Sequence, residues 1–118
     1  MVNKSTTDLS GLSVRQLRAR RRRLVRDLPD LEVILQGSLV SQGRRCGKEG
    51  CRCARGELHG PYVYLSLGRG RAESRLLYVP SSLAEEVRRR VALTQAAEAA
   101  LEEISAINLE LLRRRELV

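Results

Sequence analysis

The sequence predicts an α+β fold: a small antiparallel sheet of two to three strands, a cysteine- and histidine-containing loop, an N-terminal helix and a long C-terminal helix. Three observations predict it: an apolar stripe with helical spacing near the start, alternation of apolar and polar residues over 62–67, and no proline or glycine from 83 to about 115. With 118 residues, the chain permits one small domain, or a compact module with a helical extension. It leaves no room for a two-domain enzyme.

The first helix is predicted over residues 13–28, after a flexible segment at 1–12. Ser13 and Gln16 have the spacing of a capping box, in which two side chains satisfy backbone N–H groups where a helix begins. Apolar residues follow at helical spacing, at Val14, Leu17, Leu24, Val25 and Leu28. Arg21 interrupts this stripe within a run of four arginines.

Residues 37–80 are predicted to form a module that contains the cysteine and histidine loop and a β-hairpin. Residues 38–42 have the composition of a first strand. Residues 62–67 alternate, so the two tyrosines of this strand share one face and its aliphatic residues share the other. A turn at 68–71 and a return strand at 74–79 complete the hairpin. The tyrosine face is either available to stack on unpaired bases or covered by one of the helices.

The loop between the first two strands contains four groups that can bind a soft or borderline metal ion. Cys46, Cys51, Cys53 and His59 lie within fourteen residues, and a structural zinc ion takes four such ligands. A closed site of this kind has no position for a catalytic water, so we expect a structural zinc and no enzymatic activity. The alternatives are unligated thiols on a basic loop, or a nucleophilic Cys53 with His59 as its base.

The long helix is predicted over residues 82–116 and has the spacing of an oligomerisation helix. Apolar residues recur in a 4-3-4-3-4 pattern, at Leu93, Ala97, Ala100, Ile104, Ile107 and Leu111. A second stripe through Leu101, Asn108 and Leu112 widens this surface, so the pattern fits a helical bundle as well as a two-stranded coiled coil. We expect a homodimer through this helix. Packing of the stripe on the N-terminal helix of the same chain is the alternative.

The charge of the chain indicates a polyanionic partner. Its 22 Lys and Arg exceed its 14 Asp and Glu by +8, and residues 1–80 hold +9 while residues 81–118 hold −1. We expect nucleic acid, duplex DNA more than RNA, to contact the basic and aromatic side chains Arg20, Arg21, Arg22, Arg23, Arg44, Arg45, Lys48, Arg52, Arg55, Tyr62, Tyr64, Arg69 and Arg71. The alternative is a protein–protein assembly factor whose long helix joins a larger complex and whose basic surface keeps it soluble.

The cellular compartment is predicted from two further features. No apolar run approaches the length that crosses a bilayer, and the first residues lack the apolar core of a signal peptide. An odd number of cysteines within eight residues does not suit a disulfide framework. We therefore expect a cytoplasmic protein.

The cysteine loop resembles that of a family of small, functionally uncharacterised bacterial and archaeal proteins. The matching residues are Gly37 to Leu39, Arg44 to Lys48, Cys51, Cys53, Ala54, His59 to Tyr62 and Tyr78 to Pro80, and the likeness extends to about residue 112. Members of this family look like companions of mobile elements and phages. The resemblance therefore implies a nucleic-acid role, such as an accessory or regulator of a mobile element, and implies no particular activity.

Overall fold

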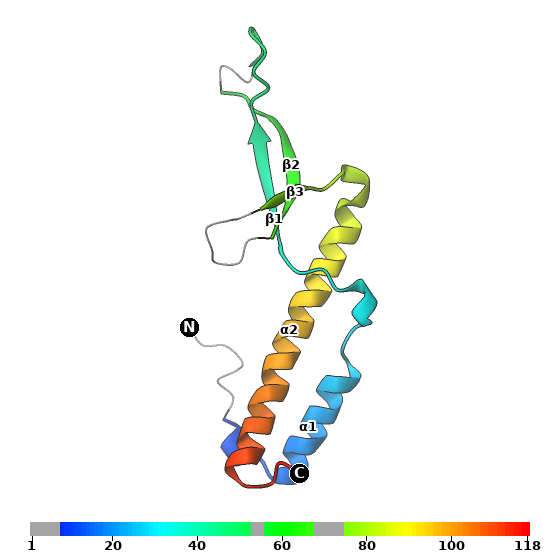
Figure 1. Cartoon of the computed structure of the whole chain (residues 1–118), viewed down its shortest axis with the longest axis vertical. Helices are drawn as coiled ribbons and strands as arrows, with labels where there is room; N and C mark the ends of the chain where they lie inside the picture. Colours follow the sequence, from blue (N-terminus) through cyan, green and yellow to red (C-terminus); the bar gives the residue numbers. More distant parts are fainter. Residues whose placement is uncertain (1–7, 53–55, 68–74) are drawn as a thin grey trace. The chain divides into compact units, whose positions relative to one another are not determined.

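The computed structural model describes residues 8–52, 56–67 and 75–118, and it confirms the predicted α+β architecture (Figure 1). Along the chain the elements are η2 (Leu9–Gly11), α1 (Val14–Arg26), η3 (Leu31–Val33), β1 (Ser38–Arg44), β2 (His59–Ser66), β3 (Leu76–Tyr78), η5 (Ser81–Leu83) and α2 (Ala84–Arg113). They form two compact units: a helical unit (Met1–Glu32 with Gln95–Val118) and a sheet unit (Val33–Thr94). Helix α2 contributes its first turns to the sheet unit and the rest to the helical unit.

In the helical unit, α1 begins with the predicted capping box. The Ser13 hydroxyl accepts a hydrogen bond from the Gln16 N–H at 3.0 Å, and the Gln16 side chain accepts one from the Ser13 N–H at 2.8 Å. Residues 9–12, predicted to be flexible, instead begin with the 3₁₀ turn η2, and the Arg114 guanidinium donates to the carbonyl oxygens of Leu9 and Ser10. Residues 1–7 lie outside the described residues.

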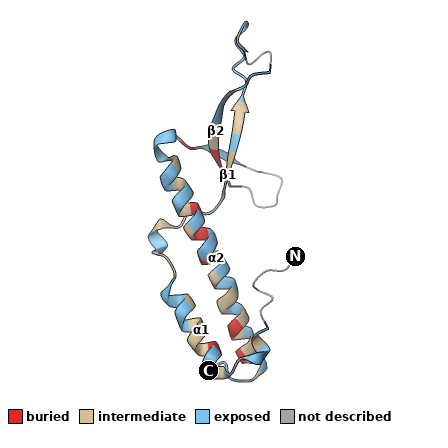
Figure 2. Cartoon of the chain, turned by 180° about the vertical axis from the view of Figure 1, so that it is seen from behind, coloured by how far each residue is buried: buried red, intermediate tan, exposed pale blue. Residues whose placement is uncertain are grey.

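The core of the helical unit joins α1 to the second half of α2. Leu17, Ile107 and Leu111 are fully buried against one another, and Leu9, Leu12, Val14 and Leu24 pack around them. Figure 2 shows buried positions in red on both helices. Apolar residues of the two helices meet because each carries a stripe with helical spacing. Packing on the N-terminal helix of the same chain, the alternative to self-association, is therefore confirmed for the last two residues of the predicted oligomerisation stripe.

The other residues of that stripe differ in how far they are buried. Ala97 is buried, whereas Leu93, Ala100 and Ile104 are half-buried. Three leucines on the same helix, Leu101, Leu109 and Leu112, are exposed. The burial of Ile107 and Leu111 needs no second copy of the chain, and dimerisation through α2 stays a prediction.

In the sheet unit, three antiparallel strands lie in the order β1-β2-β3. One face of the sheet packs on the first turns of α2 through a core of Leu65, Val79 and Val91. Two strands extend further than predicted, since β1 continues to Arg44 and β2 begins at His59, whereas β3 covers only Leu76–Tyr78 of the return strand predicted at 74–79. The predicted turn at 68–71 lies outside the described residues.

The chain enters α2 through the 3₁₀ turn η5, closed by a hydrogen bond from the Leu83 N–H to the Pro80 carbonyl at 2.9 Å. Further along, the buried Thr94 hydroxyl accepts a hydrogen bond from the Leu35 N–H at 2.7 Å and donates one to the Arg90 carbonyl. The hydrogen bond from Leu35 ties the segment before β1 to the helix that covers the sheet. None of the described helices combines the length and the apolar character that crossing a bilayer requires.

The first turn of α2 contains a carboxylate whose ionisation contributes to stability. Hydrogen bonds from Arg89 and then Arg90 lower the pKa of Glu86 from 4.5 to about 2. Since the pKa is lower in the folded chain, this contribution is complete above pH 4.5 and is lost as the pH falls towards 2. We expect Glu86→Gln to unfold at lower urea concentration than wild type at neutral pH, with a difference that disappears on acidification. Because these side chains are exposed, high salt should also reduce the difference.

Candidate metal centre

The pairing of β1 with β2 brings together two parts of the chain that are distant in sequence. Arg44, at the end of β1, lies opposite His59, at the start of β2, after a bulge in the register between Gln42 and Arg44. Gly43 occupies the bulge, where a β-carbon would lie 2.8 Å from the Leu58 β-carbon, so a larger residue could not be accommodated without a shift. The residues between the two strands therefore return to the same end of the hairpin.

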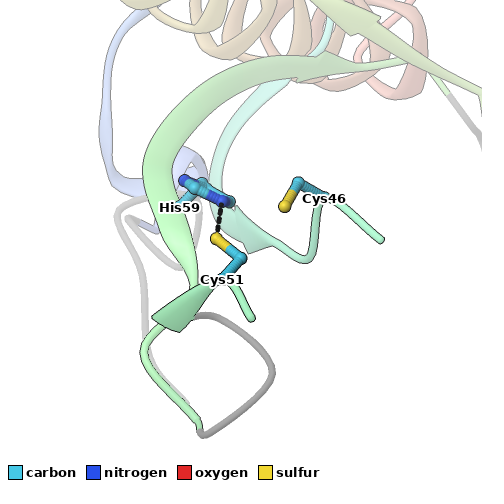
Figure 3. A group of neighbouring side chains, drawn as sticks. All are labelled: Cys46, Cys51 and His59. Carbon is cyan, nitrogen blue, oxygen red and sulfur yellow. Dashed lines mark hydrogen bonds between the residues drawn. The ribbon is translucent and has the colours of Figure 1, made fainter. Parts of the chain in front are cut away.

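Three of the four predicted ligands meet there (Figure 3). The ligand atoms of Cys46, Cys51 and His59 all lie within 4.8 Å of one another, and the Cys51 Sγ is 3.2 Å from the His59 Nε2. Cys46 is exposed, and the other two are half-buried. With metal bonds of 2.3 Å to sulfur and 2.0 Å to nitrogen, ligands around a tetrahedral zinc are about 3.5–3.8 Å apart. The three side chains lie close enough to hold a metal ion.

The backbone between the two cysteines forms a tight turn. The Lys48 N–H donates to the Cys46 Sγ at 3.4 Å, and the Cys51 N–H donates to the Lys48 carbonyl at 3.3 Å. Gly47 and Gly50 have φ of +80° and +78°, in the left-handed region that glycine adopts without strain. These glycines allow a segment of only six residues to direct both thiols to one point.

Two predicted residues of this loop, Cys53 and Arg55, lie outside the described residues, as do Arg69 and Arg71 of the hairpin turn. The prediction of Cys53 as a ligand or as a nucleophile is therefore untested. Within the described residues, the imidazole of His59 contacts Cys51. The arrangement of two thiols and an imidazole around one point is the donor chemistry that zinc prefers.

Basic residues adjoin the ligands in the sequence. Arg45, Lys48 and Arg52 are exposed, and the Arg52 guanidinium makes a long contact of 3.8 Å with the carboxylate of the exposed Glu57. Among the described carboxylates none pairs with Arg45 or Lys48. The sheet unit contains eleven basic and five acidic residues, a net of +6, while the helical unit has a net of +2. The positive charge of the chain is thus concentrated in the unit that carries the candidate metal centre.

The arginines predicted in the N-terminal helix divide into two pairs. Arg20 forms an ion pair with Glu103 at 2.6 Å, and Arg21 donates to the Asn108 side chain at 2.6 Å, so both hold α1 to α2. Arg22 and Arg23 are exposed. Only the second pair is available to bind a partner without breaking contacts between the helices.

Tyr62 and Tyr64 alternate along β2 with Val63 and Leu65, which pack in the core with Val91 of α2, so the tyrosines lie on the other face of the sheet. Tyr64 is only 9% exposed, because the Arg44 guanidinium stacks over its ring at 4.8 Å and donates to its hydroxyl at 2.8 Å. Tyr62 and Tyr78 are 37% and 52% exposed. Tyr78 was not among the predicted site residues, although its place in the return strand, paired with Tyr64, gives it the same face.

Comparison with known proteins gives one match. A family model described as Domain of unknown function (DUF6788) matches residues 14–89. The matched segment begins with α1, includes the sheet and the candidate metal centre, and ends in the first turns of α2. No curated protein and no solved structure matches the chain.

Proposed function

The chain belongs to the DUF6788 family, and from its own residues we propose that it is a non-enzymatic nucleic-acid-binding protein whose basic loop is held in place by a structural zinc ion. The observation that carries this proposal is the convergence of Cys46, Cys51 and His59 within a loop of exposed basic side chains. The mobile-element role implied by the resemblance would be one setting for such a protein.

Zinc is the proposed metal because the donor set suits it. Two cysteine thiols and an imidazole lie together, and Cys53, two residues after Cys51, is the proposed fourth ligand. With four protein ligands the ion has no open position, so it would stabilise the loop rather than activate water. A fixed loop would in turn hold Arg45, Lys48 and Arg52 in position to meet phosphates.

Nucleic acid is the proposed partner because positive charge is concentrated in the sheet unit, where basic residues outnumber acidic ones by eleven to five. Exposed arginine and lysine side chains neutralise phosphates and release counterions, and this gives an affinity that falls steeply with salt. Such contacts position a protein on the backbone and do not read sequence. Beyond its pairing with β3, the end of the β1–β2 hairpin that leads into the loop is a two-stranded ribbon, a shape that the major groove of duplex DNA admits.

The charge of the loop can be tested directly. We expect Arg45→Gln/Lys48→Gln/Arg52→Gln to weaken binding to a labelled duplex by about tenfold or more at low salt, and to reduce the slope of log K against log salt by roughly 2–3. Fluorescence anisotropy measures both quantities. The matched control is Arg88→Gln/Arg113→Gln/Arg115→Gln, which removes the same charge from exposed positions of α2 and the residues after it, and should bind as wild type.

The contrary outcomes are distinct. If wild type binds neither duplex nor single-stranded nucleic acid at low salt, the proposal fails. If the two triple variants lose affinity equally, net charge rather than the loop is responsible. In the first case the assembly factor becomes the better hypothesis, since the exposed Leu101, Leu109 and Leu112 of α2 would suit a protein partner.

A further inference from the structure

The sheet face opposite α2 carries every tyrosine in the chain. Tyr62 and Tyr64 lie on β2, Tyr78 lies opposite Tyr64 on β3, and the chain contains no tryptophan or phenylalanine. The Tyr78 ring packs edge-on against both neighbours, with centroids 6.3 Å from Tyr62 and 5.8 Å from Tyr64. The three tyrosines are therefore gathered on one face of the sheet, and none of them belongs to the core of Leu65, Val79 and Val91.

This cluster is preorganised and still accessible. Arg44 fixes Tyr64 by stacking on its ring and donating a hydrogen bond to its hydroxyl. Tyr62 and Tyr78 are 37% and 52% exposed. A partly exposed aromatic ring held by fixed neighbours loses little conformational freedom when it stacks on a planar ligand.

The positive charge next to the tyrosine cluster indicates which kind of planar ligand it binds. Arg44 belongs to the same strand end as the basic loop, since Arg45 follows it directly and Lys48 lies three residues further on. The aromatic face and the positive loop thus belong to one hairpin. Aromatic rings combined with a basic surface are the features that bind single-stranded nucleic acid, because the rings stack on bases while the cations follow the backbone.

We propose that this face binds single-stranded nucleic acid, with Tyr62 and Tyr78 stacking on unpaired bases and Arg44 positioning the rings through Tyr64. The proposal rests on the proposed function and makes it more specific. In a duplex the faces of the bases are already stacked on one another, and only their edges are presented in the grooves. The tyrosines would therefore add affinity for single strands alone, while the loop would contact phosphates in either form.

Matched variants of Tyr78 test this assignment. We expect Tyr78→Leu to weaken binding to a labelled oligothymidine by roughly five- to hundredfold, the range of one lost base stack. Tyr78→Phe keeps the ring and should bind within about twofold of wild type. Neither substitution should change the affinity for a duplex of equal length, and an oligouridine arm compares RNA with DNA.

A second measurement uses the unmodified protein and so does not depend on the folding of a variant. Because all three tyrosines lie on this face and there is no tryptophan, intrinsic fluorescence reports on it alone. After correction for absorption, we expect the emission to fall on titration with oligothymidine and to stay constant with duplex. Constant emission in both titrations would overturn the proposal.

Other outcomes are equally decisive. If Tyr78→Leu binds oligothymidine as tightly as wild type, or loses affinity for duplex to the same extent, the proposal is wrong while nucleic-acid binding stands. If the loop triple variant and wild type both fail to bind either form, the proposed function itself has failed. If the loop triple variant loses affinity for duplex and single strands, and Tyr78→Leu loses affinity for single strands only, the result supports both the proposed function and the single-strand proposal.

Discussion

Replacing Cys51 by serine should abolish stoichiometric metal binding and destabilise the sheet unit. The Cys51 Sγ lies 3.2 Å from the His59 Nε2, and a serine hydroxyl is a poor zinc ligand. Structural zinc contributes on the order of 10–16 kcal/mol of apparent binding free energy in small domains, and this free energy is coupled to folding. We therefore expect zinc to fall from about one ion per chain to none, and the melting temperature to fall by roughly 10 °C or more.

Elemental analysis and thermal unfolding, each with and without a chelator, measure this effect. The matched control is Arg52→Ser, which makes the same new residue at the neighbouring position and should keep the metal. A chelator that leaves the unfolding transition of wild type unmoved would argue against a structural ion. Acidification should also release the metal, because thiolates and imidazole bind protons in competition with it.

Cys53→Ser addresses the fourth ligand in the same assays. If Cys53 completes the site, its serine variant should lose the metal as fully as Cys51→Ser. If it retains one ion per chain, Cys46, Cys51 and His59 suffice and the fourth position is open, which would remove the argument against metal-dependent catalysis.

Replacing Leu111 by alanine should lower the free energy of unfolding by about 2–5 kcal/mol. Leu111 is fully buried with Leu17 and Ile107, so truncation removes apolar contacts and leaves a cavity between α1 and α2. Urea or thermal unfolding measures the loss. Because the contact lies within one chain, the difference between variant and wild type should not depend on protein concentration.

The neighbouring position offers a matched control. Leu112 is exposed, and Leu112→Ala should change the stability of a monomer by less than about 0.5 kcal/mol. A large effect of Leu112→Ala that shrinks as the protein is diluted would instead reveal a second copy of the chain on α2. Equal, small effects of both substitutions would contradict the core described for the helical unit.

Local features of the fold were predictable from short sequence patterns. The capping box at Ser13 depends on residues three apart, and the structure contains it. Local sequence does not reveal which helix packs on an apolar stripe. The spacing of Ile107 and Leu111 is the same whether a second copy of the chain or α1 covers them. Arg21 interrupts the first stripe and Asn108 is a polar member of the second, and the Arg21 guanidinium donates a hydrogen bond to the Asn108 side chain.

The candidate site was predictable to a similar degree. Four potential ligands within fourteen residues indicated a metal site, and three of them converge. Their geometry depends on the bulge at Gly43 and on strands that continue into a glycine-rich segment, where residue composition predicted a loop. Tyr78 was overlooked because its face follows from the register between strands, which alternation within one strand does not specify.

The division of the chain into units has a consequence for its synthesis. The sheet unit is continuous, whereas the helical unit joins residues before 33 to residues after 94. On the ribosome, α1 therefore emerges with an apolar stripe whose partners, Ile107 and Leu111, are added some ninety residues after Leu17. During that interval the sheet unit can complete its own contacts while α1 depends on chaperones, or on the seven arginines along it, to avoid association with other nascent chains.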